Sequence, residues 1–151
     1  MKLKIIIAAI CLSAFSITAI ADGQRVPYEQ IPNKAKEFIS KHMGAYQVLY
    51  AEYEREGGGY EYEVKFMFDA DITFDSDGNW TTIDPGHKRL PQSILSELPK
   101  PMADYLTKKY SLKNISEIQR WHSGYEVEID GLFDDFDLYF DASGNFIGKK
   151  R

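Results

Sequence analysis

The sequence predicts an α+β protein in which two tandem helix-plus-antiparallel-meander repeats form one continuous curved sheet, with the helices on one face. The first observation behind this prediction is internal repetition. Three blocks recur in the same order, at offsets of 65 to 67 residues: residues 31–41 return at 98–108, residues 60–64 at 125–129, and residues 72–80 at 138–146. A repeat of this length is one supersecondary unit used twice, so each half should fold to the same plan.

The second observation is the apolar spacing that opens each half. Ala35, Phe38, Ile39 and Met43 stand at i, i+3, i+4 and i+8, which predicts an amphipathic helix. The corresponding apolar stretch in the second half, residues 95–106, contains Pro99 and Pro101, so we expect a broken or kinked helical region there.

The third observation is strict alternation of apolar and polar residues after each helix. Residues 60–68 read Tyr-Glu-Tyr-Glu-Val-Lys-Phe-Met-Phe, which predicts a strand with one buried face that ends at Phe68. Glycine-containing turns separate the other predicted strands, which lie at residues 48–55 and 71–74, from Trp80 onward, and at 115–121, 125–130, 137–140 and 146–148. Residues 26–32 are predicted to be a loop that leads into the first helix.

The predicted organisation is a signal peptide at residues 1–21, a first repeat at 22–84 and a second repeat at 85–151, the two repeats together making one compact domain. Lys2 and Lys4 precede an apolar stretch, and Ala19-Ile20-Ala21 has the A-x-A form of a cleavage site. We therefore expect cleavage after Ala21, a periplasmic or secreted location, and no membrane span in the mature chain. The one cysteine, Cys11, falls inside the predicted signal.

The charge of the mature chain limits its partners. Of the 18 basic residues, Lys2 and Lys4 lie in the signal, so 16 remain against 23 acidic residues, a net charge of −7. Nucleic acid and anionic membrane both require a basic surface, so neither is expected as a partner. A basic protein, a cation or simple solubility is compatible with this charge. The mature protein is expected to be a monomer.

No pattern of catalytic residues is present, and we predict neither an enzyme nor a cofactor. His42, His87 and His122 are far apart and lack the short paired spacing of a zinc site, so they are expected at the surface or in turns. Glycine patterns that bind phosphate and the Gly-x-Ser-x-Gly nucleophile motif are both missing from the sequence.

One turn has the residue types of a calcium loop. Asp75 and Asp77 alternate ahead of Gly78 and Asn79, as oxygen ligands do around a calcium ion. The twelfth position of the EF-hand pattern, which requires glutamate, is Gly86. Hairpin chemistry explains the same residues without an ion, so both interpretations stay open.

The outward face of the predicted sheet carries the candidate contacts for a partner. These are polar or aromatic residues that alternate with apolar ones along the strands: Glu61, Glu63, Lys65, Glu126, Glu128 and Tyr139. Trp80 and Trp121, at strand ends near turns, are expected to add outward aromatic anchors, which often dominate the energy of protein interfaces.

The repeated strands and turns resemble the bacterial PepSY-like family, also described as beta-lactamase-inhibitor-like. The resemblance is carried by Leu98-Pro99, by residues 124–131 and 138–147, and in the first half by residues 60–64 and 74–80. It implies an exported, non-enzymatic protein whose tandem repeats build a concave sheet, and an inhibitory or interaction role that is often associated with peptidases. None of the contact residues of the true beta-lactamase inhibitor protein can be matched here.

Two connections depart from the family pattern. In that pattern an Asn/Asp-Gly turn leads directly from one strand into the next strand. Residues 132–136 intervene in the second half, and residues 66–70 replace the turn in the first. The leading hypothesis is a binding module for a protein or peptide of the cell envelope, of unknown identity. The alternative is a sensor of calcium or a small ligand, and an enzyme ranks third.

Overall fold

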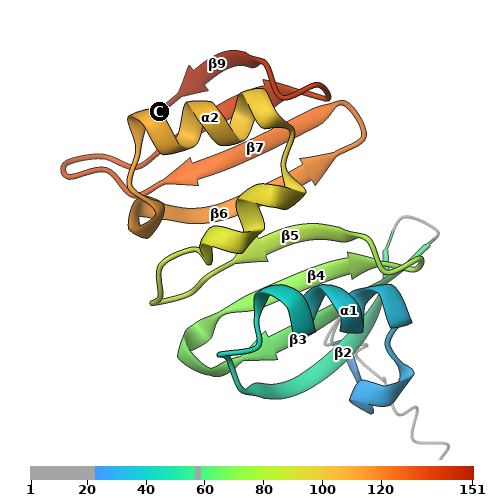
Figure 1. The fold of residues 1–151 in the computed structure, drawn as a ribbon. Helices are drawn as coiled ribbons and strands as arrows, with labels where there is room; N and C mark the ends of the chain where they lie inside the picture. The colour runs from blue at the N-terminus through green and yellow to red at the C-terminus, as the bar shows by residue number, and fades with distance from the viewer. Residues whose placement is uncertain (1–22, 57–58) are drawn as a thin grey trace, which may run out of the picture.

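The strands lie in the sheet in the same order as in the sequence, and each is antiparallel to its neighbours (Figure 1). The computed structural model describes residues 23–56 and 59–151. Over these residues one open sheet is formed by nine strands: β1 (Gln24–Val26), β2 (Val48–Glu56), β3 (Gly59–Phe66), β4 (Asp71–Asp75), β5 (Trp80–Asp84), β6 (Ile115–Trp121), β7 (Gly124–Ile129), β8 (Phe136–Asp141) and β9 (Phe146–Lys150). The predicted combination of helices with one continuous antiparallel sheet is therefore confirmed.

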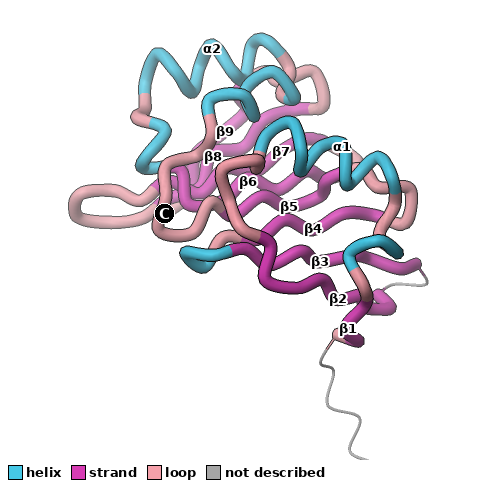
Figure 2. Tube along the Cα trace, turned by 60° about the horizontal axis from the view of Figure 1, so that its bottom comes forward, coloured by secondary structure: helices cyan, strands magenta, loops and turns pink. Residues whose placement is uncertain are grey.

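Two α-helices lie on the same side of the sheet, as Figures 1 and 2 both show. They are α1 (Asn33–His42) and α2 (Lys100–Lys109). Pro101 stands in the first turn of α2, where its missing N–H has no helical partner to lose. The proline-interrupted region is therefore split, as predicted, into α2 and a preceding 3₁₀ helix. The 3₁₀ helices are η1 (Tyr28–Gln30), η2 (Met67–Asp69), η3 (Gln92–Glu97) and η4 (Leu112–Asn114).

The hydrophobic core fills the space between the helices and the sheet. The alternating strands supply it from one face only, as Val64 with Phe66 in β3 and Val127 with Ile129 in β7, all at most 2% exposed. Helix α1 contributes Phe38, whose ring meets Phe74 edge-on at 5.8 Å. Because successive strand residues point to opposite faces, the remaining side chains of these strands lie on the helix-free face.

The two halves join at the β5–β6 pair. Thr82 lies opposite Gln119, and Ile83 lies opposite Ile118. Both isoleucines are fully buried, so the pair continues the core from one half to the other. The Asp84 carboxylate accepts a hydrogen bond of 2.6 Å from the Gly86 N–H at the start of the connection between the halves.

Three sequence-based expectations about strands were wrong. Val26, predicted as the first residue of the lead-in loop, is instead the last residue of β1, a three-residue edge strand that pairs Arg25 with Glu52. Strand β3 ends at Phe66 and not at Phe68, because Met67–Asp69 turn into η2, and Phe68 is 47% exposed. Trp80 points inward and is 3% exposed, since the β4–β5 register places it opposite Phe74 on the core face.

The predicted signal peptide lies outside the described residues, as does the middle of the predicted turn at residues 56–59. Within residues 23–56 and 59–151, no helix is long and apolar enough to cross a membrane.

Each α-helix begins against a hairpin turn of its own half. Gly78 and Gly144 occupy these turns with φ of +81° and +83°, a conformation that costs glycine little. A Cβ at Gly144 would lie 2.5 Å from Pro99 Cβ and 3.1 Å from Met102 Cβ, so the turn packs directly on the start of α2. A Cβ at Gly78 would lie 2.8 Å from Pro32 Cβ, next to α1. The glycines therefore set how closely each helix approaches its hairpin.

We expect Gly144→Ala to lower the free energy of unfolding by about 1–3 kcal/mol, because the new methyl group is strained by the positive φ and also collides with Pro99. Urea denaturation measures this change. The matched control is Gly148→Ala in β9, where a Cβ meets no atom within 4 Å. Equal stability of the two variants would contradict the packing role of Gly144.

Candidate functional site: the helix-free face of the sheet

Over the described residues, the helices cover one face of the sheet and leave the opposite face without a covering layer (Figure 2). The strand register assigns its residues, since each lies opposite another outward residue on the next strand. Two cross-strand rows run across this face from β3 to β9. One row is mainly acidic and the other is mainly neutral and polar.

The acidic row consists of five carboxylates on five consecutive strands. The pairing register aligns each of them with the next: Asp71, Asp84, Glu117, Glu128 and Asp137. Asp84 lies beside Glu117 because Ile83 pairs with Ile118 in the antiparallel β5–β6 pair. Lys65 lies opposite Asp71 at one end, and Lys150 lies opposite Asp137 at the other. The sheet therefore presents a band of negative charge that ends in a lysine on each side.

The neighbouring row is polar and carries less charge. Its members lie one step along each strand from the acidic row and are also aligned by register: Glu63, Thr73, Thr82, Gln119, Glu126, Tyr139 and Gly148. The Tyr139 hydroxyl donates a hydrogen bond of 3.1 Å to Glu126 Oε1. Partial desolvation and this hydrogen bond raise the pKa of Tyr139.

The charged forms of three carboxylates in the acidic row are disfavoured by burial and by mutual repulsion. Burial raises the pKa of Asp71, Glu117 and Glu128 above the ordinary carboxyl values, and repulsion from neighbouring carboxylates adds to the effect in each case. The neighbours that repel Glu117 are Glu128, Asp84 and Asp71. Like charges directly opposite each other on adjacent strands destabilise a sheet, so the row costs folding free energy.

Lys65 relieves the row at one end. Its Nζ lies 2.9 Å from Asp71 Oδ2 and 2.7 Å from Glu63 Oε1. Burial alone would lower the pKa of Lys65, but the hydrogen bonds to Glu63 and Asp71 outweigh it and raise the pKa. The same ammonium offsets part of the upward shift of the Asp71 pKa. Further along the row, Glu117 accepts a hydrogen bond from the Gln119 side chain.

Two hollows lie on this face along the polar row. One, of about 260 Å³, is lined by Glu54, Glu61, Glu63 and Thr73. The other, of about 250 Å³, is lined by Glu61, Thr81, Thr82, Gln119, Arg120 and Trp121. Glu61 lines both, so the two hollows adjoin, and Trp121 is 56% exposed at the rim. The face thus offers recesses as well as charge.

The predicted contact residues fall into two groups on this face. Glu61, Glu63 and Lys65 lie together on β3, whereas Glu126, Glu128 and Tyr139 lie together on β7 and β8. Three strands separate the groups, a distance of about 19 Å between β3 and β7 at the usual strand spacing.

Sequence reasoning missed the carboxylates between these groups, Asp71, Asp84 and Glu117. Considered one by one, they were interpreted as charged residues at the solvated edge of the protein. Their alignment depends on the register between strands, which within each half could have been inferred from the positions of the hairpin turns.

The predicted calcium ligands are engaged in a turn. Asp75 Oδ1 accepts hydrogen bonds from the N–H groups of Asp77 and Asn79, at 3.0 and 2.8 Å. Asp141 makes the same bonds with Ser143 and Asn145 in the other half. Across the described residues, no group of three or more His, Cys, Asp or Glu side chains is placed to hold a metal ion. The turn bonds account for Asp75, and calcium binding by Asp75 and Asp77 stays a prediction.

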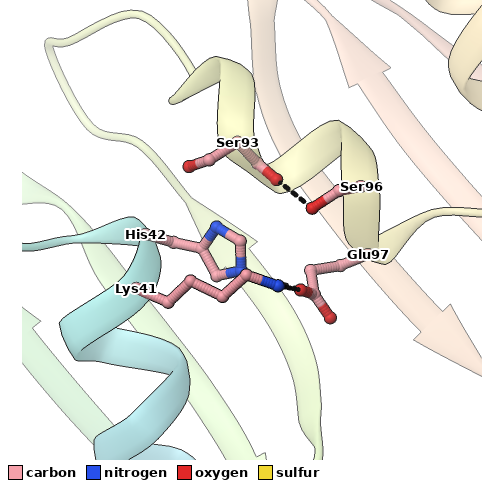
Figure 3. A network of polar contacts seen from close by, with 5 residues as sticks. All are labelled: Lys41, His42, Ser93, Ser96 and Glu97. Carbon is pink, nitrogen blue, oxygen red and sulfur yellow. Dashed lines mark hydrogen bonds and ion pairs between the residues drawn. The ribbon is translucent and has the colours of Figure 1, made fainter.

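A separate polar cluster links α1 to η3 on the helix side (Figure 3). His42 Nε2 lies 2.8 Å from Glu97 Oε1, and Lys41 Nζ lies 2.6 Å from the same oxygen. The carboxylate accepts, so His42 carries a hydrogen on Nε2. The expectation that all three histidines are at the surface or in turns was wrong for His42, whose side chain is fully buried at the C-terminal end of α1.

This cluster has two parts of a catalytic triad but lacks the third. A histidine bonded to a carboxylate requires a nucleophile on its other ring nitrogen. The Nδ1 atom of His42 is buried with no hydrogen-bond partner among the described residues, and the nearby Ser96 hydroxyl donates to the Ser93 carbonyl at 2.7 Å. The hydrogen bonds on Glu97 from Lys41 and His42 lower the pKa of Glu97 despite partial burial. The cluster therefore fastens α1 of the first half to η3 of the second.

The open antiparallel sheet with helices on one face defines a known family of proteins. The chain belongs to the beta-lactamase-inhibitor-like, PepSY-like family, whose model matches residues 60–148. The family expected from the sequence is thereby confirmed. No curated protein matches the chain.

Solved structures from Bacteroides species are similar over most of the chain. A "putative calcium-regulated periplasmic protein" of Bacteroides thetaiotaomicron is 27% identical, with a TM-score of 0.74, and the match covers 86% of this chain and 98% of that one. A "putative periplasmic protein of unknown function" of Bacteroides vulgatus is 25% identical, with a TM-score of 0.70 and coverage of 83% and 95%. Another Bacteroides vulgatus protein, at 23% identity, TM-score 0.74 and coverage of 87% and 99%, shows the fold alone.

We expect Glu117→Gln to raise the free energy of unfolding at pH 7 by about 0.2–1 kcal/mol, because it removes one of two opposed like charges. The pKa of Glu117 is higher in the folded than in the unfolded chain, so its favourable contribution is complete below about pH 4.3 and is lost as the pH rises through the folded value. The gain of the variant should therefore vanish in acid. Urea titrations at pH 4 and pH 7 measure it, with Glu37→Gln on α1 as the control.

We expect Glu97→Ala to lower the free energy of unfolding by about 1–3 kcal/mol at pH 7, since it leaves a buried imidazole without its hydrogen bond. The pKa of Glu97 is lower in the folded chain, so its contribution is present above about pH 4.3 and is lost as the pH falls below that value. Glu97→Gln, which keeps an acceptor oxygen, should lose less than Glu97→Ala. If the exposed Glu37→Ala were equally damaging, the cluster would have no special role.

Proposed function

We propose that this protein is an exported, non-enzymatic binding module whose helix-free sheet face engages a basic protein or peptide of the cell envelope. The observation that carries this proposal is the acidic row. Its members are aligned, partly buried and mutually repulsive, so they cost stability in the isolated chain. A cationic partner would neutralise the row and remove that cost, which gives binding a direct electrostatic driving force.

The arrangement of the face supports binding more than catalysis. The hollows beside Glu61 are lined by carboxylates, threonine hydroxyls, Gln119, Arg120 and Trp121, and no histidine is among these lining residues. The His42–Glu97 pair lies on the other side of the sheet, and the His42 side chain is closed to solvent. Membership of an inhibitor-like family agrees with a role that occupies a partner's surface. The predicted export agrees with the periplasmic description of two similar Bacteroides proteins.

We also infer that residues 22–84 and 85–151 are tandem copies of one unit. Each contains an α-helix followed by four strands, β2 to β5 in the first and β6 to β9 in the second. The Asp75 and Asp141 turns have the same hydrogen bonds, and each places a glycine against the start of the helix in its own half. A duplicated unit explains how one acidic row extends over both halves.

A calcium sensor is the second candidate function. It is favoured by the description of the Bacteroides thetaiotaomicron protein as calcium-regulated and by the number of carboxylates on the sheet face. Asp75 and Asp77 remain the first residues to test. In a sensor, millimolar calcium would raise the melting temperature by several degrees where magnesium would not, and Asp75→Asn would remove the difference.

The binding proposal predicts that a lysine-rich peptide binds the mature chain through the sheet face. The double variant Glu63→Lys/Glu128→Lys should weaken this binding at least tenfold, as measured by isothermal titration calorimetry in 50 mM salt. A glutamate-rich peptide of equal length should not bind.

The control is Glu37→Lys/Asp104→Lys, which makes the same change of net charge on the exposed surface of α1 and α2. Equal weakening by both double variants would show that only net charge matters and would overturn the proposed face. Both variants should melt within a few degrees of the wild type, because all four side chains are at least partly exposed.

A further inference from the structure

The two connections that replace simple turns each expose large apolar side chains. Leu132 and Phe133, between β7 and β8, are 89% and 90% exposed. Met67 and Phe68, in η2 between β3 and β4, are 38% and 47% exposed. Single exposed apolar residues need no explanation, but adjacent pairs in equivalent connections do. We call Met67 with Phe68 the first tip and Leu132 with Phe133 the second tip.

The base of the second tip is held by hydrogen bonds. The Asp130 N–H donates to the Asn114 carbonyl at 2.8 Å, and the Asn114 side-chain amide donates back to the Asp130 carbonyl at 3.0 Å. The Gly131 N–H donates to Asp135 Oδ1 at 3.1 Å, which closes the loop on itself. The apolar pair is therefore carried outward by an anchored loop.

The first tip is held outward at a conformational cost. Phe68 and Asp69 have φ of 68° and 57°, a region that side-chain-bearing residues occupy rarely. The Phe68 carbonyl accepts a hydrogen bond of 2.9 Å from the His87 N–H, and a Cβ at Gly86 would lie 2.1 Å from that same oxygen. Strain of this kind persists only where the surroundings enforce it.

A recess lies beside the first tip. Its volume is about 240 Å³, and it is lined by Ala45, Tyr46, Phe68 and Lys88. The recess is large enough for a leucine or phenylalanine side chain. The Lys88 ammonium lies 4.0 Å from the centre of the Phe68 ring.

Both tips lie at the same end of the sheet and bracket the acidic row. Figures 1 and 2 place η2 and the β7–β8 connection on the same side of the molecule. Asp71 follows the first tip at the start of β4, and Asp137 follows the second tip near the start of β8. Four strand spacings separate the two connections, about 19 Å.

Lys88 lies beside the first tip, but the charges beside the second tip and between the tips are acidic, and they indicate the occupant. Asp130, Asp134 and Asp135 flank the second tip, and the row between the tips is acidic. An anionic bilayer would be repelled by these groups, and so would a second copy of a chain with a formal net charge of −5. A basic polypeptide with apolar side chains is complementary both to the row and to the tips.

We propose that the two tips are paired apolar anchors for one basic polypeptide segment, with an apolar side chain at each end of a lysine- and arginine-rich stretch. One apolar side chain enters the recess beside Phe68, and the other packs on Leu132 and Phe133. A distance of about 19 Å corresponds to about six residues in an extended segment or about 13 in a helix. This inference rests on the proposed function, because the basic stretch lies over the acidic row.

The test uses a displayed library of random 16-residue peptides, selected for binding to the mature chain. The enriched peptides should carry lysine or arginine between two apolar residues. Their binding should fall tenfold or more for Phe133→Ser and for Phe68→Asn, since buried aromatic anchors dominate such interfaces. Asparagine tolerates positive φ, so Phe68→Asn should keep the fold. Ile147→Ser, a 66% exposed residue near the opposite end of the sheet, is the control and should bind unchanged.

The outcomes separate this inference from the proposed function. Peptides that lose binding to Glu63→Lys/Glu128→Lys but not to the tip variants would overturn the anchors and leave the binding face intact. Peptides that lose binding to the tip variants but not to the charge variant would overturn the claim that the peptide lies over the acidic row, and with it the proposed function of the sheet face. Failure to enrich any peptide, or enrichment of acidic peptides, would count against both.

A vesicle experiment tests the tips against lipid. The wild-type chain should not co-sediment with neutral phosphatidylcholine vesicles. Sedimentation of the wild type that Phe133→Ser abolishes would reassign the second tip to a membrane and overturn the proposal.

Discussion

The pairing of β5 with β6 is the contact on which the arrangement of the molecule depends. Two buried isoleucines, Ile83 and Ile118, lie opposite each other there and fix the register between the halves. A slip of one residue would turn the outward side chains of one half to the core face, so the buried pair holds the register firmly. The same register brings Asp84 into line with Glu117. The acidic row is therefore continuous only because an apolar contact on the other face sets the alignment.

One face of the sheet carries the packing that stabilises the fold, and the other is the proposed binding face. The helix side contains the core, the hairpin glycines against α1 and α2, and the His42–Glu97 contact between the halves. On the opposite side, burial and, to a smaller extent, mutual repulsion raise the pKa values of Asp71, Glu117 and Glu128. The core can sustain this cost because its own packing does not involve the outward residues. A surface that reduces stability while remaining ordered is well suited to bind a partner of opposite charge.

The connections between strands add chemistry that a flat sheet lacks. Where a short turn would suffice, this chain places exposed apolar residues on loops held by hydrogen bonds and, at Phe68, by a strained backbone. Rigid elements that present variable loops are a common way to build specificity, because loops change without disturbing the core. In the proposed binding mode, the acidic row supplies the electrostatic contribution and the two tips supply the apolar contribution.

Local sequence patterns determined the elements and their faces, whereas long-range packing decided how those elements meet. The alternation in residues 60–66 was enough to place Glu61, Glu63 and Lys65 outward, and the repeat predicted an open antiparallel sheet with helices. Burial of Trp80 and His42 could not be predicted, because it depends on how α1 docks on β4, β5 and η3. The acidic row was equally inaccessible, since Asp84 and Glu117 are 33 residues apart and only the β5–β6 register aligns them. Periodicity is a property of neighbouring residues, but register between distant strands is set by the tertiary structure.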